Sequence, residues 1–396
     1  MSKSLHYRPE IDGLRALSVL LVIFHHLGVT FFSGGYIGVD VFFVISGYLI
    51  TSIITKEVSQ QKFSIKGFYK RRIVRLAPAY FIVIATTSLV SMFALLPSEL
   101  INYLDSVTYS TFFLANFYMW SEAGGYFGSQ ADFIPLLHLW SLAVEEQFYI
   151  FWPIILVVFY KLFKFKGITL FVLFSALLCL IVSEYGAQKY TAAAYYLMPT
   201  RAVELMLGAL LVFLPKYQFS ILIRNFLTLL GLSLIVYTAV MYTTATVFPG
   251  INALTPCFGA MLIIHCADYK KDFVGKVLSV KPVNFIGKIS YPAYLWHWPI
   301  IVFCNIYLIN ISFLIGLLIL FITLIISFLT FQYIENPAKK ALNWRLGKIF
   351  LVGFIVPALV LLVLTYTSNV NDGFPERFSE SLALKSKAIL RSGIYF

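Results

Sequence analysis

The chain alternates long apolar stretches with short polar ones. Eleven apolar stretches come close to the roughly 20 helical residues needed to cross a ~30 Å hydrocarbon core. They lie at 13–32, 36–55, 76–96, 137–160, 167–185, 197–215, 223–243, 250–267, 288–309, 312–333 and 348–368. The pattern therefore predicts an all-α, polytopic membrane helix bundle with eleven spans.

Basic residues gather in alternate loops between these stretches. The largest group lies in 56–75, and smaller groups lie in 161–166, 216–224, 270–288 and 339–348. The segment 97–136 contains no Lys or Arg. Because cytoplasmic loops are enriched in Lys and Arg, we expect a cytoplasmic N-terminus and an extracytoplasmic tail. A further apolar stretch at 104–120 would invert every later basic loop if it spanned, so we predict a re-entrant or surface-lying helix there.

Composition supports the membrane interpretation. Only 12% of residues are charged and 60% are hydrophobic, whereas about 25% charged residues are usual in a soluble domain. The net charge of +12 comes from short loops between spans, so it indicates contact with membrane lipids and no nucleic acid. The four cysteines have neither pairing nor metal-ligand spacing and are typical of small core residues. We therefore expect no metal site.

The first span carries costly polar residues, which mark functional sites within membranes. Arg15 and His26 are eleven residues apart, which gives about 16 Å of rise and places them within roughly 20° of one helical face. By the same geometry, His25 points about 80° away. Asp12 is spaced to pair with Arg15 at i, i+3.

Asp40 in the second span is a candidate partner for His26. Counted from the connecting turn, the two residues lie at similar depth, so the Asp40 carboxylate could accept one ring N–H of His26. The other ring nitrogen would then serve as a base. The alternative is an Asp that caps its helix and a histidine with a structural role.

Two further groups of polar residues stand out. Arg72 and Arg75 share one face of a helical turn in the densest basic loop; they suit phosphate binding, although a positive-inside anchor has the same composition. His138, Glu145 and Glu146 lie in the fourth span, where buried carboxylates require a partner or a wet cavity. They are candidates, with His25, for an acceptor pocket or a proton relay. By contrast, Trp296–Trp298 predicts an aromatic packing cluster around a hydrogen-bonded histidine.

These landmarks together resemble the acyltransferase-3 family of membrane O-acyltransferases. The matching stretches are Arg8–Ala16, Gly34–Thr51, the pair Arg72 and Arg75, His138–Tyr149, Ser290–Pro299 and Tyr333–Pro337. The family signature, an Arg followed by ten residues and a His, falls on Arg15 and His26. His25 departs from the family pattern, which usually has an aromatic residue there.

The resemblance implies an acyl-CoA donor, usually acetyl-CoA, and a hydroxyl acceptor on an extracytoplasmic glycan. The family's paired Arg motif falls on Arg72 and Arg75. Our hypothesis is that His26, oriented by Asp40, is catalytic and that Arg15, Arg72 and Arg75 bind the donor. No permanently bound cofactor is expected, because acetyl-CoA is a co-substrate. The expected location is the bacterial inner membrane.

The resemblance also predicts the division of the chain. Residues 1–337 would form the ten-span acyltransferase-3 membrane domain, and 338–368 a cytoplasmic linker with an eleventh span. Residues 369–396 would be an extracytoplasmic tail, which we interpret as the start of a linker to a missing SGNH-type domain. Members with that domain are commonly linked to O-acetylation of lipopolysaccharide O-antigen, so O-antigen is the favoured acceptor.

Three alternatives remain open at this stage. Within the same enzyme class, the acceptor could be peptidoglycan or a small molecule. A transporter or flippase for acyl groups or lipid-linked glycan would lack acetyl-CoA turnover. A structural anchor for an outer enzyme domain would not need a basic loop facing a buried histidine.

Overall fold

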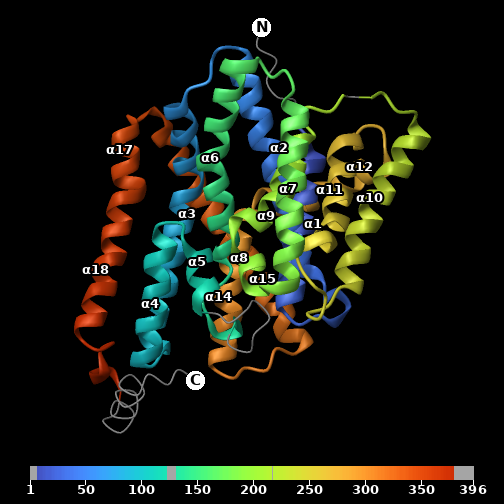
Figure 1. Ribbon diagram of the computed structural model, residues 1–396. Coiled ribbons are helices and arrows are strands. Elements are labelled where there is room, and N and C mark those ends of the chain that lie inside the picture. The colour runs from blue at the N-terminus through green and yellow to red at the C-terminus, as the bar shows by residue number, and fades with distance from the viewer. Residues whose placement is uncertain (1–6, 123–130, 216, 379–396) are drawn as a thin grey trace. The chain divides into compact units, whose positions relative to one another are not determined.

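The structure is a computed structural model that describes residues 7–122, 131–215 and 217–378 (Figure 1). All regular secondary structure within these ranges is helical, which confirms the all-α prediction. The last part of the expected tail, residues 379–396, lies outside the described residues.

The chain divides into two compact units that interleave along the sequence. In the described part, the first comprises residues 7–63, 144–215 and 217–294, and the second comprises 64–122, 131–143 and 295–378. The boundaries expected at 337 and 368 both fall inside the second unit.

The first unit is built from helices of very unequal length. They are α1 (Pro9–His26), α2 (Gly38–Ser59), α7 (Ile168–Lys189), α8 (Thr191–Tyr196), α9 (Met198–Leu210), α10 (Ile221–Met241), α11 (Leu254–Cys266), α12 (Phe273–Leu278) and α13 (Lys281–Lys288). Two helices run from one unit into the other, α6 (Leu139–Phe163) and α14 (Ser290–Ile306).

The second unit contains α3 (Ile65–Ala94), α4 (Pro97–Thr111), α5 (Ala115–Glu122), α15 (Phe313–Thr330), α16 (Asn336–Ala338), α17 (Leu346–Phe350) and α18 (Val356–Val370). Within it, α18 packs along α4. The Thr365 hydroxyl donates to the Leu104 carbonyl at 3.2 Å, so the last expected span belongs to the packed bundle.

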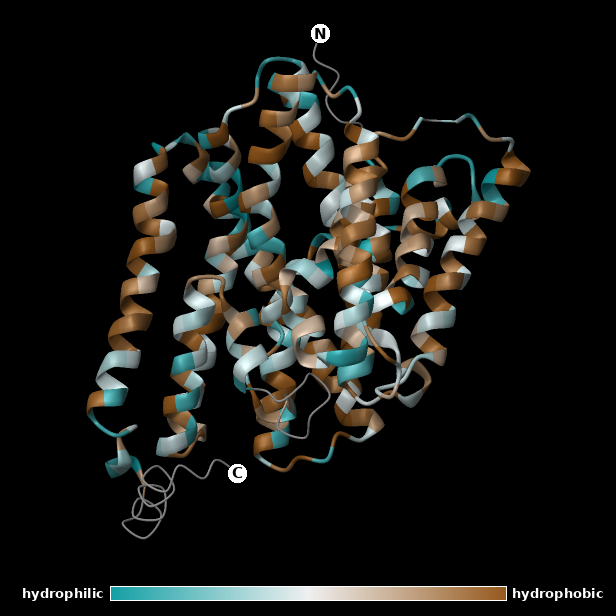
Figure 2. Cartoon of the chain, viewed as in Figure 1, coloured by the Kyte–Doolittle hydropathy of each residue, from teal (hydrophilic) through white to brown (hydrophobic). Residues whose placement is uncertain are grey.

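Among the described residues, seven helices are long and apolar enough to cross a membrane. They are Gly35–Ser59, Ile65–Ala94, Leu139–Phe163, Ile168–Lys189, Ile221–Met241, Phe313–Asn343 and Leu346–Val370. Figure 2 shows apolar residues along most of α10 and α18, as expected for helices that face lipid. The chain is therefore a multi-pass membrane protein.

The other four expected spans correspond to shorter or more polar helices. Helix α1 has 18 residues, and three of them, Glu10, Asp12 and Arg15, are charged. Helix α9 has 13 residues, α14 has 17, and the segment Gly250–Cys266 is also short. The count of eleven spans and the cytoplasmic N-terminus stay predictions.

The stretch 104–120 is not one helix. It is divided between α4 and α5, which are separated at Phe112–Leu114. The break occurs where Phe113 adopts a positive φ of 56°, a conformation that an α-helix cannot continue through. Neither helix is among the seven candidate spans.

Candidate functional site

Helix α1 presents the residues that the sequence singled out. Arg15 Nη1 lies 3.8 Å from Asp12 Oδ1, and both side chains are about one-sixth exposed. This confirms the expected i, i+3 pair. His26 is the last residue of α1 and is half-buried. Because Gly28 has a φ of 73°, the chain leaves the helix directly after His26.

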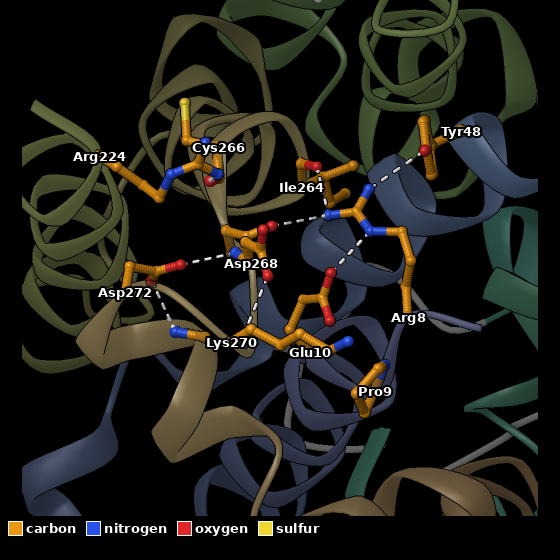
Figure 3. Close-up of polar contacts among 12 residues, drawn as sticks. Arg8, Pro9, Glu10, Tyr48, Arg224, Ile264, Cys266, Asp268, Lys270 and Asp272 are labelled. Carbon is orange, nitrogen blue, oxygen red and sulfur yellow. Dashed lines mark hydrogen bonds and ion pairs between the residues drawn. The ribbon is translucent and has the colours of Figure 1, made fainter. Parts of the chain in front are cut away.

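The N-terminal end of α1 is anchored by Arg8 (Figure 3). Its Nε donates to the buried Glu10 carboxylate at 2.7 Å, and its Nη1 donates to the Tyr48 hydroxyl at 3.2 Å. Its Nη2 donates to the carbonyl of Ile264 at 2.8 Å. One guanidinium therefore fixes the start of α1 against α2 and α11.

Two arginines share the C-terminal end of α11. Arg8 reaches the carbonyls of Ile264 and Ala267, and Arg224 donates to the carbonyl of Cys266 at 2.6 Å (Figure 3). The last carbonyls of a helix lack intrahelical partners and carry partial negative charge. Cations are therefore favoured there. Arg8 ties this end of α11 to the start of α1, and Arg224 ties it to α10.

A second anchor lies near Arg15. The Tyr7 hydroxyl is 2.8 Å from side-chain oxygens of both Asp12 and Asn284. Burial and the hydrogen bond to Asp12 raise the pKa of Tyr7 to about 12. Tyr7 therefore remains protonated at physiological pH, so the carboxylate that pairs with Arg15 keeps its hydrogen-bond donor.

His25 and His26 face different surroundings. The His25 ring packs edge-on against Tyr36 with 5.4 Å between centroids, and it hydrogen-bonds the backbone of Phe32 and Ser33. These contacts tie the end of α1 to the loop that follows it. These contacts fix the His25 ring in place, and its role in an acceptor pocket or proton relay stays a prediction.

The depth argument that joined Asp40 to His26 is wrong. A methyl group on Gly38 would collide with the carbonyl of Ser18. Ser18 lies eight residues, or about 12 Å of helix rise, from His26. Asp40 lies still farther along α2, which runs antiparallel to α1. The connection Leu27–Ile37 is long enough to shift the register, which counting from a tight turn did not allow for.

Asp40 pairs with Arg201 of α9. The distance from Arg201 Nη1 to Asp40 Oδ1 is 3.2 Å, and the same nitrogen lies 3.0 Å from Glu204 Oε1. All three side chains are at most 1% exposed. Arg201 and Glu204 are three residues apart in the sequence, a helical spacing, but nothing in the sequence indicates that Asp40 joins them.

Two glycines explain why α2 and α9 meet so closely. A methyl group on Gly47 would collide with the backbone of Leu205, and one on Gly208 would collide with Val44. Small residues at a membrane helix crossing let the two backbones approach. This close crossing brings the Asp40 carboxylate of α2 within reach of Arg201 on α9.

Glu145 forms a separate polar cluster between α6 and α2. Its Oε1 accepts hydrogen bonds from the Ser46 and Tyr149 hydroxyls. Ser46 and Glu145 are half-buried, whereas Tyr149 is buried. The carboxylate thus has the partner from another helix that its position in a span requires. Its neighbour Glu146 is also half-buried.

His138 lies in the second unit, with His297 as its neighbour. Their rings meet edge-on at 5.7 Å between centroids, and both residues are at most 2% exposed. The flanking Trp296 and Trp298 donate hydrogen bonds to Thr330 Oγ1 and to the Ile134 carbonyl, each at 2.9 Å. His297 therefore packs against the ring of His138, while the two tryptophans bond to other parts of the second unit.

Arg72 and Arg75 lie in α3 of the second unit. The helix begins after Ser64, whose hydroxyl accepts from the Gly67 N–H at 3.2 Å. Arg75 is exposed, whereas Arg72 is half-buried with its guanidinium 5.8 Å from the Phe68 ring centroid. The pair is thus presented on one turn at the start of a span, as the spacing predicted.

The family described as acyltransferase domain matches residues 8–332 of this chain. The chain belongs to this family. The match begins at Arg8, the residue that anchors α1, and it includes every candidate site residue. It extends over both compact units.

Relatives named O-acetyltransferase match most of the chain. O-acetyltransferase OatA of Staphylococcus aureus strain NCTC 8325 / PS 47 is 34% identical over 351 residues, which cover 84% of this chain and 57% of that protein. A protein of strain MRSA252, provisionally named an O-acetyltransferase, is 32% identical over 412 residues, covering 95% of this chain and 66% of its own length. The chain thus spans about two thirds of the length of such relatives. No solved structure gives a significant match.

Proposed function

We propose that the protein transfers an acetyl group from cytoplasmic acetyl-CoA to a hydroxyl of an extracytoplasmic glycan, in the bacterial inner membrane. The family and the names of the relatives support O-acetyl transfer. The observation that carries the proposal is that Arg15 and His26 belong to one continuous helix, α1. Helix geometry places both residues on one face of it. Acyl transfer from acyl-CoA requires a cation near the diphosphate and a base near the thioester. Arg15 and His26 would supply these two groups, about 16 Å apart along α1.

The reach of the donor fits this spacing. The arm from the diphosphate to the sulfur of CoA has thirteen bonds, which extend to about 15 Å at roughly 3.5 Å for every three bonds. The rise from Arg15 to His26 is about 16 Å. Arg15 would therefore bind the diphosphate while the thioester approaches His26. Arg72 and Arg75 would bind phosphate groups nearer the cytoplasm.

His26 is the proposed general base. Its free ring nitrogen would take the proton of the acceptor hydroxyl as the oxygen attacks the thioester carbonyl. The new C–O bond forms, the C–S bond breaks, and the leaving thiolate of CoA takes the proton from His26. In an alternative route, His26 itself carries the acetyl group before passing it to the acceptor.

The remaining candidates have supporting roles in the proposal. Glu145, Glu146 and His138 would shape the acceptor pocket or relay protons. Asp40 would act only indirectly, because its carboxylate is closed off against Arg201. The acceptor proposed first is lipopolysaccharide O-antigen, and peptidoglycan is the alternative.

The test is acetyl transfer in membrane vesicles that contain the protein. Labelled acetyl-CoA is supplied on the cytoplasmic side, and O-antigen or peptidoglycan fragments are supplied on the other. We expect label in one glycan with the wild type and none with His26→Ala. Glycan movement without any acetyl-CoA turnover would instead identify a transporter or flippase.

A further inference from the structure

The cluster of Asp40, Arg201 and Glu204 takes no direct part in the steps above. Its side chains are at most 1% exposed, so no substrate touches them. Burying three ionisable groups costs several kcal/mol per ion before their attraction is counted. Charges inside a membrane protein are retained mainly where they serve a function.

Aromatic rings enclose the guanidinium of Arg201. Its Cζ lies 5.6 Å from the Phe43 ring centroid, 5.3 Å from that of Tyr195 and 5.4 Å from that of Phe248. A planar guanidinium stacks on ring faces while its N–H groups bind carboxylates, and an ammonium group cannot do both. Arg201 therefore links the carboxylates to three rings at once.

The rings continue from this cage to the end of α1. Phe248 packs edge-on against Tyr36 at 5.0 Å between centroids, and Tyr36 packs edge-on against His25 at 5.4 Å. The His25 and His26 rings are 5.3 Å apart. An unbroken series of ring contacts thus joins Arg201 to His26 within the first unit.

Backbone contacts hold the same region together. The Tyr36 hydroxyl donates to the Thr243 carbonyl at 3.2 Å, and Ser33 Oγ donates to the Tyr242 carbonyl at 2.7 Å. The loop after α1 is therefore fixed to the loop after α10, which also carries Phe248. Moving Phe248 would disturb both the rings and this loop contact.

We propose that Arg201 is a positioning residue for His26. Held by Asp40 and Glu204, it fixes Phe248, and the Phe248–Tyr36–His25 contacts set the orientation of the His26 ring. The inference rests on the proposed function for its effect on turnover. It also predicts an effect on the reactivity of His26 that needs no substrate.

Arg201→Lys and Phe248→Leu test this role. Lysine keeps a positive charge near Asp40 and Glu204 but loses the planar surface, whereas Phe248→Leu leaves the ion cluster intact. Phe213→Leu is the control, because Phe213 contacts Phe165 and lies outside the cage. Each variant is purified in nanodiscs, and its thermal stability is recorded first.

Three quantities are then measured: acetyl transfer, hydrolysis of acetyl-CoA to acetate, and the rate of His26 modification by diethyl pyrocarbonate, read by mass spectrometry. We expect both cage variants to fold, to lose about tenfold in transfer, and to raise the hydrolysis-to-transfer ratio about threefold. Their His26 modification rate should change about threefold. Phe213→Leu should match the wild type in all three.

Several outcomes would overturn the inference. Normal transfer and His26 reactivity in Arg201→Lys would show that charge compensation alone is required. Unchanged His26 reactivity in Phe248→Leu would show that the ring contacts do not orient it, and equal losses in Phe213→Leu would indicate general packing. If only the proposed function is wrong, His26→Ala keeps its transfer activity while the modification rates still differ.

Discussion

The Asp40 carboxylate on α2 lies 3.2 Å from the Arg201 guanidinium on α9. Asp40 precedes Gly47 by seven residues, and Arg201 precedes Gly208 by seven. Seven residues are close to two helical turns, so each charged residue shares a face with its glycine. The crossing at the glycines therefore leads directly to the ion pair two turns away.

The two glycines should be intolerant of side chains. Gly208→Val would force a side chain into the backbone of Val44, and we expect about 1–3 kcal/mol of destabilisation, as in overpacked cores. The measurement is unfolding of the purified protein in detergent. Gly347→Ala is the control, because nothing lies within 4 Å of the position of its added Cβ. Equal stability of the two variants would contradict the close crossing.

Replacing both Asp40 and Glu204 should lower the free energy of unfolding by more than the sum of the two single replacements. Asp40→Asn or Glu204→Gln leaves one carboxylate on Arg201, whereas the double variant leaves a buried cation without a counter-charge. The expected loss in the double variant is about 3–5 kcal/mol. A double-mutant cycle of unfolding free energies measures the coupling. Additive effects would mean that the two carboxylates act independently.

The two adjacent histidines should differ in their importance for catalysis. His26→Ala should lower the rate of acetyl transfer by about 10²–10⁴-fold, the usual contribution of a general base. His25→Phe, which keeps a ring against Tyr36, should retain most activity. Both rates are compared at saturating acetyl-CoA in vesicles with matched protein content. An active His26→Ala together with an inactive His25→Phe would reverse our assignment.

Arg72 should contribute to acetyl-CoA affinity. A charge-assisted hydrogen bond contributes about 1.5–3 kcal/mol, so Arg72→Ala should raise the KM for acetyl-CoA about tenfold or more, with the acceptor KM unchanged. Arg71→Ala is the matched control, since its side chain points about 100° away on the helix. An unchanged KM in Arg72→Ala would contradict phosphate binding and would indicate that Arg72 and Arg75 act only as a positive-inside anchor.

Only one of the two contacts of the candidate Glu145 could be read from the sequence. Glu145 required a partner, and the structure supplies the Ser46 and Tyr149 hydroxyls. Tyr149 is one turn away on the same helix and could have been predicted. Ser46 is 99 residues distant in the chain, and its approach depends on how α2 and α6 pack.

The sequence by itself determined what depends on local periodicity. Spacing along single helices placed Arg15 and His26 on one face, paired Asp12 with Arg15, and turned His25 away. Apolar length and low charge established a helical membrane protein. These features follow from 100° and 1.5 Å per residue, which any helix obeys whatever surrounds it.

Tertiary structure alone decided which residues meet across helices. The partner of Asp40 is Arg201, 161 positions away, and not His26 in the neighbouring span. The register of two helices depends on loop length and on where small residues allow contact, here at Gly47 and Gly208. Loop length and the contact positions of small residues follow no helical period along the chain. The Asp40–Arg201 pair, which we propose helps to position His26, therefore could be found only in the fold.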